Sequence, residues 1–507
     1  MRAKSGLVCA VFLALVLYLV TLSRTWTADS LLFALDVESG DTARMVDPYH
    51  LLSHPLGWLF YQLWGWAGWS GRAIVPLQVL NALGGAACVG LVYALARHLT
   101  ESARAAVLAA AGVGVSGGLW LLSVEAEFVT LPLAAHLAVL WLLLAAPARW
   151  AQRQAYALGL GLAVILAALT YLTGLLLLGV VVVGLLLRRE LPRAVRRRQV
   201  PIVAAVVLVV AGAGLLLLAG WAGGGPAEWW WLFGGGRAYG QLSWTNLPHG
   251  VYAFLRSLAL YPGLAMNEST RAFLTTAAAR GRVLFGLYYL VVGVMALLPL
   301  LVALRCRQRL WAEHRRELGT LAVWTVLYGG FAIYWVPGDI SFWVPLLVAW
   351  WLLAALVLPP VRYGEMAMSA MVSVLLVANA LLAILPRHDL ARNTRYALVR
   401  ELAEHTAPAD LVLMGGGDGL LAVYATYFAR RQVAGLSLEG ADLNAFTGWA
   451  GRVWRDGGRV FGAGFPPTME PLLDSWCASV GRALGKPCSR LSAGWQMRGG
   501  AVWELRP

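Results

Sequence analysis

The chain has 507 residues, of which 60% are hydrophobic and only 13% are charged. A soluble domain usually carries about 25% charged residues, so the composition excludes a soluble globular protein and indicates a membrane protein. The net charge of +14 comes largely from arginine clusters between apolar segments, such as "RRELPRAVRRRQ" and "RCRQRLWAEHRRE". Such clusters are typical of cytoplasmic loops of membrane proteins, so we predict no nucleic-acid partner.

The first apolar segment covers about residues 6–22, after the basic start "MRAK". We interpret it as an uncleaved membrane helix, with a cleaved signal peptide as the alternative. The loop that follows, residues 24–73, is rich in acidic residues and continues into "GWLFYQLWGWAGW". Because tryptophan-rich stretches with few charges prefer the membrane–water interface, this stretch predicts a helix lying along the membrane lipid.

Further apolar segments are long enough to cross a bilayer as helices. They lie near residues 74–97, 104–122, 128–146, 155–170, 172–187, 200–221, 283–304, 319–336, 342–358 and 366–385. The weakest boundary is "TYLTG", where the chain has to turn between two short segments. With the first segment, the sequence predicts an all-α polytopic membrane protein of about 11 transmembrane helices.

The basic clusters set the predicted orientation. If the N terminus is cytoplasmic and the helices alternate, every strongly basic cluster between segments falls inside. Five pieces then lie outside: residues 24–73, 123–128, 222–282, 337–341 and the C-terminal tail. We therefore predict a membrane module over residues 1–386 and an extracytoplasmic soluble domain over 387–507. The abundance of Ala, Gly, Arg and Trp points to a bacterial cytoplasmic membrane.

The tail has the pattern of a small α/β domain. "NTRYALVRELAEHTAP" has helical spacing, "ADLVLMGGG" is typical of a buried strand that ends in a glycine turn, and "GLLAVYATYFARR" is helical again. The run "MGGGDG" lacks both the Walker lysine and the full spacing of a dinucleotide-binding loop. Cys477 and Cys488 both lie in this tail, on the predicted oxidising side, where a disulfide between them is plausible.

Three separate outer segments bring acidic residues to one membrane face. The segment "SVEAEF" carries Glu125 and Glu127, and "PGDIS" carries Asp339. The opening loop carries Asp36, Glu38, Asp41, Asp47, His50 and His54. Carboxylates at a membrane interface are costly unless they are paired, hydrated or functional. We therefore treat the three segments together as a candidate site.

Several of these residues also have structural interpretations. Asp47 and His50 are best interpreted as solvated loop residues, and Asp36 could be a cap or turn residue as readily as a functional one. Glu125 or Glu127 could cap a helix where the chain leaves the membrane. Asp339 in "PGD" is typical of a turn.

The opening segments resemble the GT-C superfamily of membrane glycosyltransferases, and most closely its protein O-mannosyltransferase-like branch. That branch has a D-S-G-E type motif, then H-P-P-G, an Arg/Asn-containing helix start, and E-V-Y. The corresponding stretches are "ESGD" (38–41), "HPLGWLF" (54–60), "LNAL" with Asn81, and "EFVTL" (127–131). Glu38 and Asp41 exchange the expected acids, and Leu56 and Val129 replace the expected Pro and Tyr.

The resemblance implies transfer of a sugar from a polyprenyl-phosphate donor, with inversion, to a protein, lipid or glycan acceptor on the extracytoplasmic face. A carboxylate of the first outer loop would act as general base, with Asp41 and Glu38 preferred and Asp36 third. The implied scheme needs no metal or other cofactor, although a divalent metal is possible. Substrate-binding candidates are His54, Glu127, Glu125, Asp339 and, for the leaving phosphate, Arg237. Other cations that could meet the phosphate are Arg256, Arg271, Arg280, Arg282, Arg44 and Arg72.

Two other classes of function remain open. A transporter or flippase of a lipid-linked glycan would place ionisable residues at the membrane midplane and often has internal repeats. The apolar segments contain almost no charge, and we find no repeat between the two halves. A non-catalytic envelope assembly protein would tolerate alanine at Glu38, Asp41 and Glu127.

Overall fold

The computed structural model describes residues 2–45, 47, 49–222, 240, 243–261, 277–414, 419–435, 443–463, 474–478, 482, 488–497 and 500–506. Contacts divide the chain into two units. The first comprises Met1–Ser23 and Asp36–His388, and the second comprises Arg24–Leu35 and Asp389–Pro507. The second unit thus includes part of the first predicted outer loop, and the helix α2 (Ala28–Ser39) belongs to both units.

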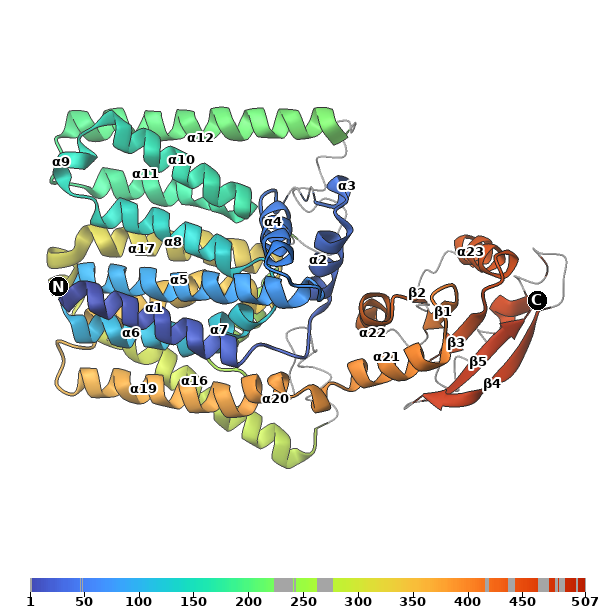
Figure 1. Ribbon diagram of the computed structural model, residues 1–507. Coiled ribbons are helices and arrows are strands. Elements are labelled where there is room, and N and C mark those ends of the chain that lie inside the picture. The colour runs from blue at the N-terminus through green and yellow to red at the C-terminus, as the bar shows by residue number, and fades with distance from the viewer. Residues whose placement is uncertain are drawn as a thin grey trace. The chain divides into compact units, whose positions relative to one another are not determined.

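The first unit is a bundle of helices, most of which run alongside one another (Figure 1). Every apolar segment of the sequence is largely helical, because in lipid a helix satisfies its own backbone hydrogen bonds. The helices are α1 (Arg2–Val20), α3 (Thr42–Met45), α4 (Ser53–Trp66), α5 (Ile74–Thr100), α6 (Ala103–Val115), α7 (Gly117–Val124), α8 (Thr130–Ala145), α9 (Ala148–Ala151), α10 (Gln154–Thr170), η1 (Leu172–Leu176), α11 (Leu177–Leu187), α12 (Arg193–Ala222), α14 (Asn246–Leu258), α16 (Ala279–Arg305), α17 (Arg307–Trp335), η3 (Ile340–Trp343), α18 (Val344–Val357), α19 (Gly364–Asn379), η4 (Ala380–Ile384) and α20 (Leu385–His388).

By length and composition, 5 helices of the described chain can cross a membrane, or 6 if α6 and α7 form one span. Shorter apolar helices cover Ser5–Val20, Thr130–Ala145, Gln154–Thr170 and Leu172–Leu187. Apolar side chains are exposed along α16, where Leu287, Val294 and Leu301 are each more than half exposed, as expected of a surface that contacts lipid. The predicted number of eleven spans stays a prediction.

The segment predicted as one span over 104–122 is a pair of helices, α6 and α7, bent by 60°. The break lies at Ser116, whose backbone is extended and whose hydroxyl donates to the carbonyl of Gly112 at 2.7 Å and accepts from Trp351 at 3.0 Å. A Cβ on Gly117 would meet the side chain of Leu260 at 2.7 Å. The bend is therefore held by side-chain hydrogen bonds and by close packing that requires a glycine.

The two ends of the bundle differ in charge. The N terminus and α9 lie at one end, and α4 lies across the opposite end (Figure 1). At the N-terminal end, Arg188 and Arg316 both contact Glu190, at 2.8 and 2.9 Å, and both also donate to carbonyls near the end of α8. Basic segments therefore gather at this end, and the acidic outer segments belong to the other.

The second unit contains a five-stranded mixed sheet in the order β2-β1-β3-β5-β4. Strand β1 (Leu411–Met414) is fully buried and pairs in parallel with β2 (Gln432–Gly435) and β3 (Val460–Ala463). Antiparallel β5 (Gly500–Arg506) joins β3 to β4 (Ser489–Met497). The helices around this sheet include α21 (Thr394–His405), α22 (Gly419–Tyr424), η6 (Ala425–Ala429) and α23 (Leu443–Arg455). Most of "MGGGDG" lies outside the described residues.

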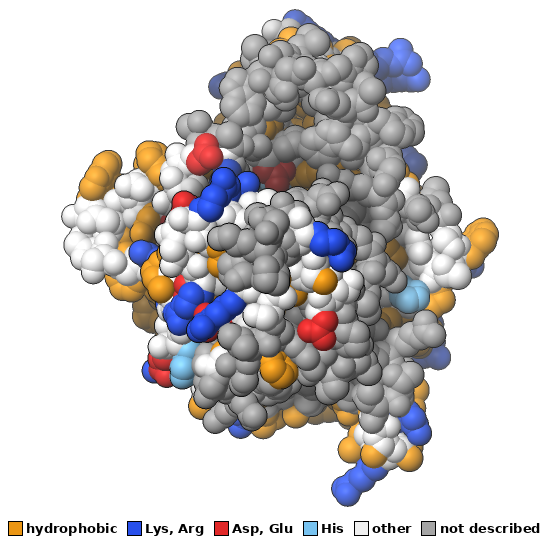
Figure 2. Space-filling view, turned by 90° about the vertical axis from the view of Figure 1, so that its right-hand side faces the viewer, with side chains coloured by type: hydrophobic (Ala, Val, Ile, Leu, Met, Phe, Trp, Pro, Cys, Tyr) orange, Lys and Arg blue, Asp and Glu red, His pale blue; other side chains and the backbone are white. Residues whose placement is uncertain are grey.

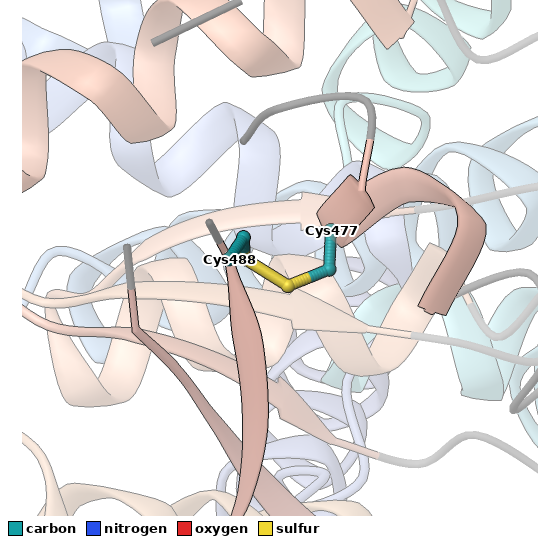
Figure 3. The surroundings of a disulfide bond; sticks show 2 residues. All are labelled: Cys477 and Cys488. Atoms are coloured by element: carbon teal, nitrogen blue, oxygen red, sulfur yellow. A yellow bond between two sulfur atoms is a disulfide. The ribbon is translucent and has the colours of Figure 1, made fainter. Parts of the chain in front are cut away.

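Cys477 and Cys488 form a disulfide in this unit, as the sequence suggested (Figure 3). On the face in Figure 2, described Arg side chains lie among Asp and Glu side chains rather than in one basic patch. Within this unit, Arg459 is paired with Asp410 at 2.9 Å. Burial alone would raise the pKa of Asp410, but hydrogen bonds from Ala407 and Arg459 lower it below the usual range.

Candidate functional site

Asp36 and His54 form the centre of the candidate site. Asp36 lies in the part of α2 that belongs to the first unit, and His54 lies in the first turn of α4. The His54 Nε2 is 3.8 Å from the Asp36 Oδ2, with the side chains 6% and 28% exposed, respectively. This distance suits an ion pair or a bridged contact, but it is too long for a direct hydrogen bond.

Burial has opposite effects on the two groups. It raises the pKa of Asp36 above the usual Asp range, and the neighbouring His54 opposes this rise. It lowers the pKa of His54, although Asp47 and Asp36 favour the protonated ring. A carboxylate with a raised pKa is a stronger base than a solvated one, so Asp36 is better suited to accept a proton than an ordinary Asp.

Glu38, two residues further along α2, has a different environment. Its two carboxylate oxygens each accept from the Arg72 Nε at 2.8 Å, and one also accepts from the Ala73 backbone N–H at 2.8 Å. Both partners immediately precede α5. The Glu38 carboxylate is therefore engaged in joining α2 to the start of α5, which leaves its oxygens less suited to take up a substrate proton.

Asp41 lies after the end of α2. Its side chain is 51% exposed, and its Oδ2 is 3.8 Å from the Arg44 Nε. Exposed pairs of this kind are screened by water and impose little geometry. Of the two bases preferred from the sequence, Glu38 is thus paired with Arg72 and Asp41 is exposed to solvent. The third candidate, Asp36, lies beside the buried imidazole of His54.

His50 corrects one prediction. The sequence favoured a solvated loop residue, but His50 is only 6% exposed, because its ring packs on Tyr171 and Phe128, with centroid distances of 4.5 and 3.8 Å. Burial lowers the pKa of His50 to about 3, so its ring is neutral at physiological pH. No local sequence signal identified Tyr171 as its partner, since the two residues are brought together by the fold.

The loop that carries these histidines is attached to the turn after α10. The Leu52 N–H donates to the Leu169 carbonyl at 2.8 Å, and the Ser53 hydroxyl donates to the Thr170 carbonyl at 2.7 Å. In return, the Leu172 N–H donates to the Tyr49 carbonyl at 2.9 Å. The turn at "TYLTG", predicted as the weakest boundary, thus supports the site.

The segment "SVEAEF" lies beside the first outer loop, so these two segments of the predicted candidate site are close together in the structure. Phe128 contacts the rings of both His50 and His54, the latter at a centroid distance of 6.0 Å. Glu127 is 5% exposed. Glu125 is completely buried, and its carboxylate accepts from the Arg387 guanidinium of α20 at 2.7 Å. Glu125 therefore joins the last helix of the bundle to this segment.

The remaining candidates lie elsewhere or outside the described residues. Asp339 caps η3, because its Oδ1 accepts from the Ser341 N–H at 2.9 Å and from the Ser341 hydroxyl at 2.8 Å. Arg237 and Arg271 are not among the described residues. Arg256 of α14 is buried, with its guanidinium 5.6 Å from the Tyr252 ring centroid. Of the cations predicted to meet the leaving phosphate, Arg237 and Arg271 therefore cannot be placed, whereas Arg256 is described and buried.

A pocket lies in the bundle between α8, η1, α17 and η3. Tyr171, which stacks on His50, is part of its wall, and His136 lies on the α8 side. The rest of the lining is mainly apolar. Among the described residues, no group of three or more His, Cys, Asp and Glu side chains could hold a metal ion. The metal-free scheme itself stays a prediction.

No protein-family model matches the chain, and no curated protein matches it. Solved structures of ArnT from Cupriavidus metallidurans are similar over nearly their whole length. The apo structure has a TM-score of 0.63 at 14% identity, over 99% of this chain and 98% of that chain. The structure bound to undecaprenyl phosphate has a TM-score of 0.58 at 15% identity, over 98% of this chain and 97% of that chain.

The chain has the GT-C fold. It is an integral membrane protein by this fold and by its apolar helices. The predicted GT-C-like fold of the membrane bundle is thereby confirmed, whereas the predicted O-mannosyltransferase-like branch has no support from these neighbours. At such low identity the similarity concerns the fold, so the reaction is argued from the site.

Proposed function

We propose that the protein is an integral-membrane glycosyltransferase that takes a sugar from a polyprenyl-phosphate donor and transfers it to an acceptor on the extracytoplasmic face. The observation that carries this proposal is the half-buried Asp36 carboxylate, 3.8 Å from the buried His54, in a GT-C fold. The binding of undecaprenyl phosphate by the similar ArnT supports a lipid-linked donor. The gathering of basic segments at the opposite end of the bundle supports the orientation.

Asp36 is the proposed general base. It would accept the proton of the acceptor hydroxyl while that oxygen attacks the anomeric carbon and the bond to the carrier phosphate breaks, which inverts the anomeric centre. His54, whose pKa is lowered by burial, would orient the carboxylate or donate to the acceptor. Glu127 is the second proposed substrate contact. Glu38, Glu125 and Asp339 would act by holding the segments around the site.

The leaving carrier phosphate needs positive charge or hydrogen-bond donors. Arg237 stays the proposed contact of the carrier phosphate, since it lies in the segment 222–282, which is predicted to be extracytoplasmic. The apolar surface of the bundle would hold the carrier chain in the membrane. The acceptor is proposed as a protein, lipid or glycan of the cell envelope, without a choice among them.

The test compares wild type, Asp36→Asn and Asp41→Asn, each purified in lipid. A panel of polyprenyl-phosphate sugars is supplied with a cell-envelope extract, and release of the carrier phosphate is followed. We expect Asp36→Asn to lose about 100-fold or more of the turnover, since general base catalysis contributes roughly 10²–10⁴-fold. Asp41→Asn, which changes a solvated carboxylate, should stay near wild type.

Two outcomes would contradict the assignment. If a folded Asp36→Asn variant turned over like wild type while Asp41→Asn failed, the base would be Asp41, and the family motif would be aligned as the sequence first suggested. If wild type consumed none of the donors, the transfer reaction would be wrong for these substrates, and transport or assembly would be the better explanation of the acidic loops.

A further inference from the structure

Polar side chains at the start of α5 bind both of the segments that carry the candidate acids. Arg72 and the Ala73 N–H hold Glu38, which lies on the same helix as Asp36. One turn further on, the Gln78 amide donates to the Ser23 carbonyl at 2.7 Å and to the Val124 carbonyl at 2.9 Å. The α5 N-terminus is thus a common point of attachment for segments far apart in the chain.

Asn81, further along α5, holds the second of these segments by several hydrogen bonds of its side chain. It is 3% exposed, and its Nδ2 donates to the carbonyls of both Glu125 and Glu127, the first at 2.9 Å. Its Oδ1 accepts from the Thr130 hydroxyl at 2.9 Å. The same hydroxyl also lies 2.9 Å from the Asn81 backbone carbonyl. One carboxamide therefore holds the chain from the end of α7 to the start of α8.

The held segment has little regular structure of its own. Residues 125–129 lie between α7 and α8 and belong to neither helix. Two backbone carbonyls in this short segment, those of Glu125 and Glu127, are bonded to Asn81, so the peptide units around Ala126 have few alternative orientations. Phe128, the next residue, contacts the rings of His50 and His54. The place of Glu127 relative to Asp36 thus depends on a residue that carries no charge.

We propose that Asn81 is a positioning residue that sets Glu127 and Phe128 against the Asp36–His54 pair. This inference rests on the proposed function and adds that catalysis also requires Asn81, a residue that does not itself react. Both acid-bearing segments are attached to one long helix, so the separation of their carboxylates is determined by α5. Misplacement of reacting groups by about 1 Å can cost about 100-fold in rate, so loss of the Asn81 carboxamide should lower kcat.

Asn379 of α19 provides a matched control. It is also fully buried, its Nδ2 donates to the carbonyls of Val115 and Leu258 at 2.8 and 3.0 Å, and its Oδ1 accepts from the Leu260 N–H at 2.9 Å. Both asparagines thus make two donor contacts and an acceptor contact in the bundle. Alanine at either position should lower the thermal unfolding midpoint by similar amounts.

The experiment compares wild type, Asn81→Ala and Asn379→Ala in lipid by two measurements. Hydrogen–deuterium exchange reports the protection of backbone amides in residues 123–131. Steady-state kinetics with a polyprenyl-phosphate sugar separate kcat from KM. We expect faster exchange in this segment and a fall of about 100-fold in kcat for Asn81→Ala, with KM for the lipid donor little changed. Asn379→Ala should keep the wild-type exchange in this segment and a kcat near wild type.

Equal losses of kcat in the two variants, in proportion to their losses of stability, would overturn the proposal, because Asn81 would then act as an ordinary buried residue. Unchanged exchange of residues 123–131 in Asn81→Ala would overturn it as well. If wild type consumes no donor, the proposed function fails separately, and the exchange comparison alone decides: faster exchange confined to Asn81→Ala supports positioning, and equal exchange rejects it.

Discussion

Asp36, Glu38 and Asp41 lie close together in the sequence, yet each carboxylate has a different environment. Asp36 is partly buried beside His54, Glu38 is bonded to Arg72, and Asp41 is solvated. The difference follows from helical geometry, since residues two apart on α2 project to different sides. Chemical type therefore does not distinguish these residues, and burial does not separate Asp36 from Glu38, whose side chains are 28% and 18% exposed. The pairing of Glu38 with Arg72 is what separates them, because a carboxylate held by a guanidinium is a weaker base.

His50 provides a test at this scale that needs no substrate. Its pKa is about 3 in the folded protein against an ordinary 6.5. As the pH falls below about 6.5, the unfolded chain takes up a proton that the folded protein excludes, so the stabilisation present above 6.5 is lost progressively towards pH 3. We expect His50→Phe, which keeps a ring against Tyr171, to weaken this dependence of the thermal unfolding midpoint on pH.

The control for this experiment is His98→Gln at an exposed position on α5. This variant should keep the pH dependence of wild type. A His50→Phe protein with an unfolding midpoint as pH-sensitive as that of wild type would show that other groups dominate the acid response.

At the scale of elements, the site depends on contacts between helices that are far apart in the sequence. The end of α7 meets α20 through Glu125 and Arg387, and α2 meets the start of α5 through Glu38 and Arg72. The bend between α6 and α7 directs α7 towards this end of the bundle. The candidate acids thus lie on short irregular segments, but rigid helices determine where those segments are.

The buried pair predicts an asymmetry in stability. Arg387→Met leaves the completely buried Glu125 without this cation, and we expect a loss of about 3 kcal/mol, as for other buried pairs broken on one side. Adding Glu125→Leu should recover much of that loss, because the uncompensated charge is then removed. Thermal or denaturant unfolding in a detergent micelle provides the measurement.

An exposed pair serves for comparison. Arg309 and Glu313 lie 3.0 Å apart on α17 with side chains 69% and 50% exposed. Arg309→Met should cost less than about 1 kcal/mol. If Arg387→Met were no more damaging than Arg309→Met, the buried pair would not support the segment in the way we infer.

At the scale of the whole molecule, the chain combines a bundle with the GT-C fold and a mixed α/β unit. The second unit includes Arg24–Leu35 as well as the tail. Trp26 is its anchor, because its backbone N–H donates to the Tyr424 hydroxyl at 2.8 Å and its ring packs on Phe428 at a centroid distance of 4.8 Å. The disulfide between Cys477 and Cys488 fits an oxidising compartment.

Orientation can be tested by thiol labelling in intact cells, with Cys9 and Cys306 replaced by Ser. A cysteine introduced by Glu404→Cys, on the exposed side of α21, should react with a membrane-impermeant maleimide without permeabilisation. A cysteine introduced by Glu313→Cys, at the basic end of the bundle, should react only after permeabilisation, because arginine-rich loops stay in the cytoplasm. The reverse pattern would contradict the predicted orientation.

The sequence alone was sufficient for features that depend on local composition. Long apolar segments must become helices in lipid, so the helical class follows from their lengths, and the strand at Leu411–Met414 follows from its short apolar run. The three acid-bearing outer segments were also identified, as were the two cysteines, because each signal lies within a few neighbouring residues. The order of preference among the acids was not accessible in this way.

The tertiary structure decided which residues surround each acid. His54 lies beside Asp36, Arg72 pairs with Glu38, and Asn81 donates to the Glu127 carbonyl, and each of these partners comes from another segment. His50 was predicted to be solvated because it lies in a loop, but its neighbours in space are Tyr171 and Phe128. The effective pKa of a group and the identity of its hydrogen-bond partners depend on what surrounds it in three dimensions, so residue order alone does not determine them.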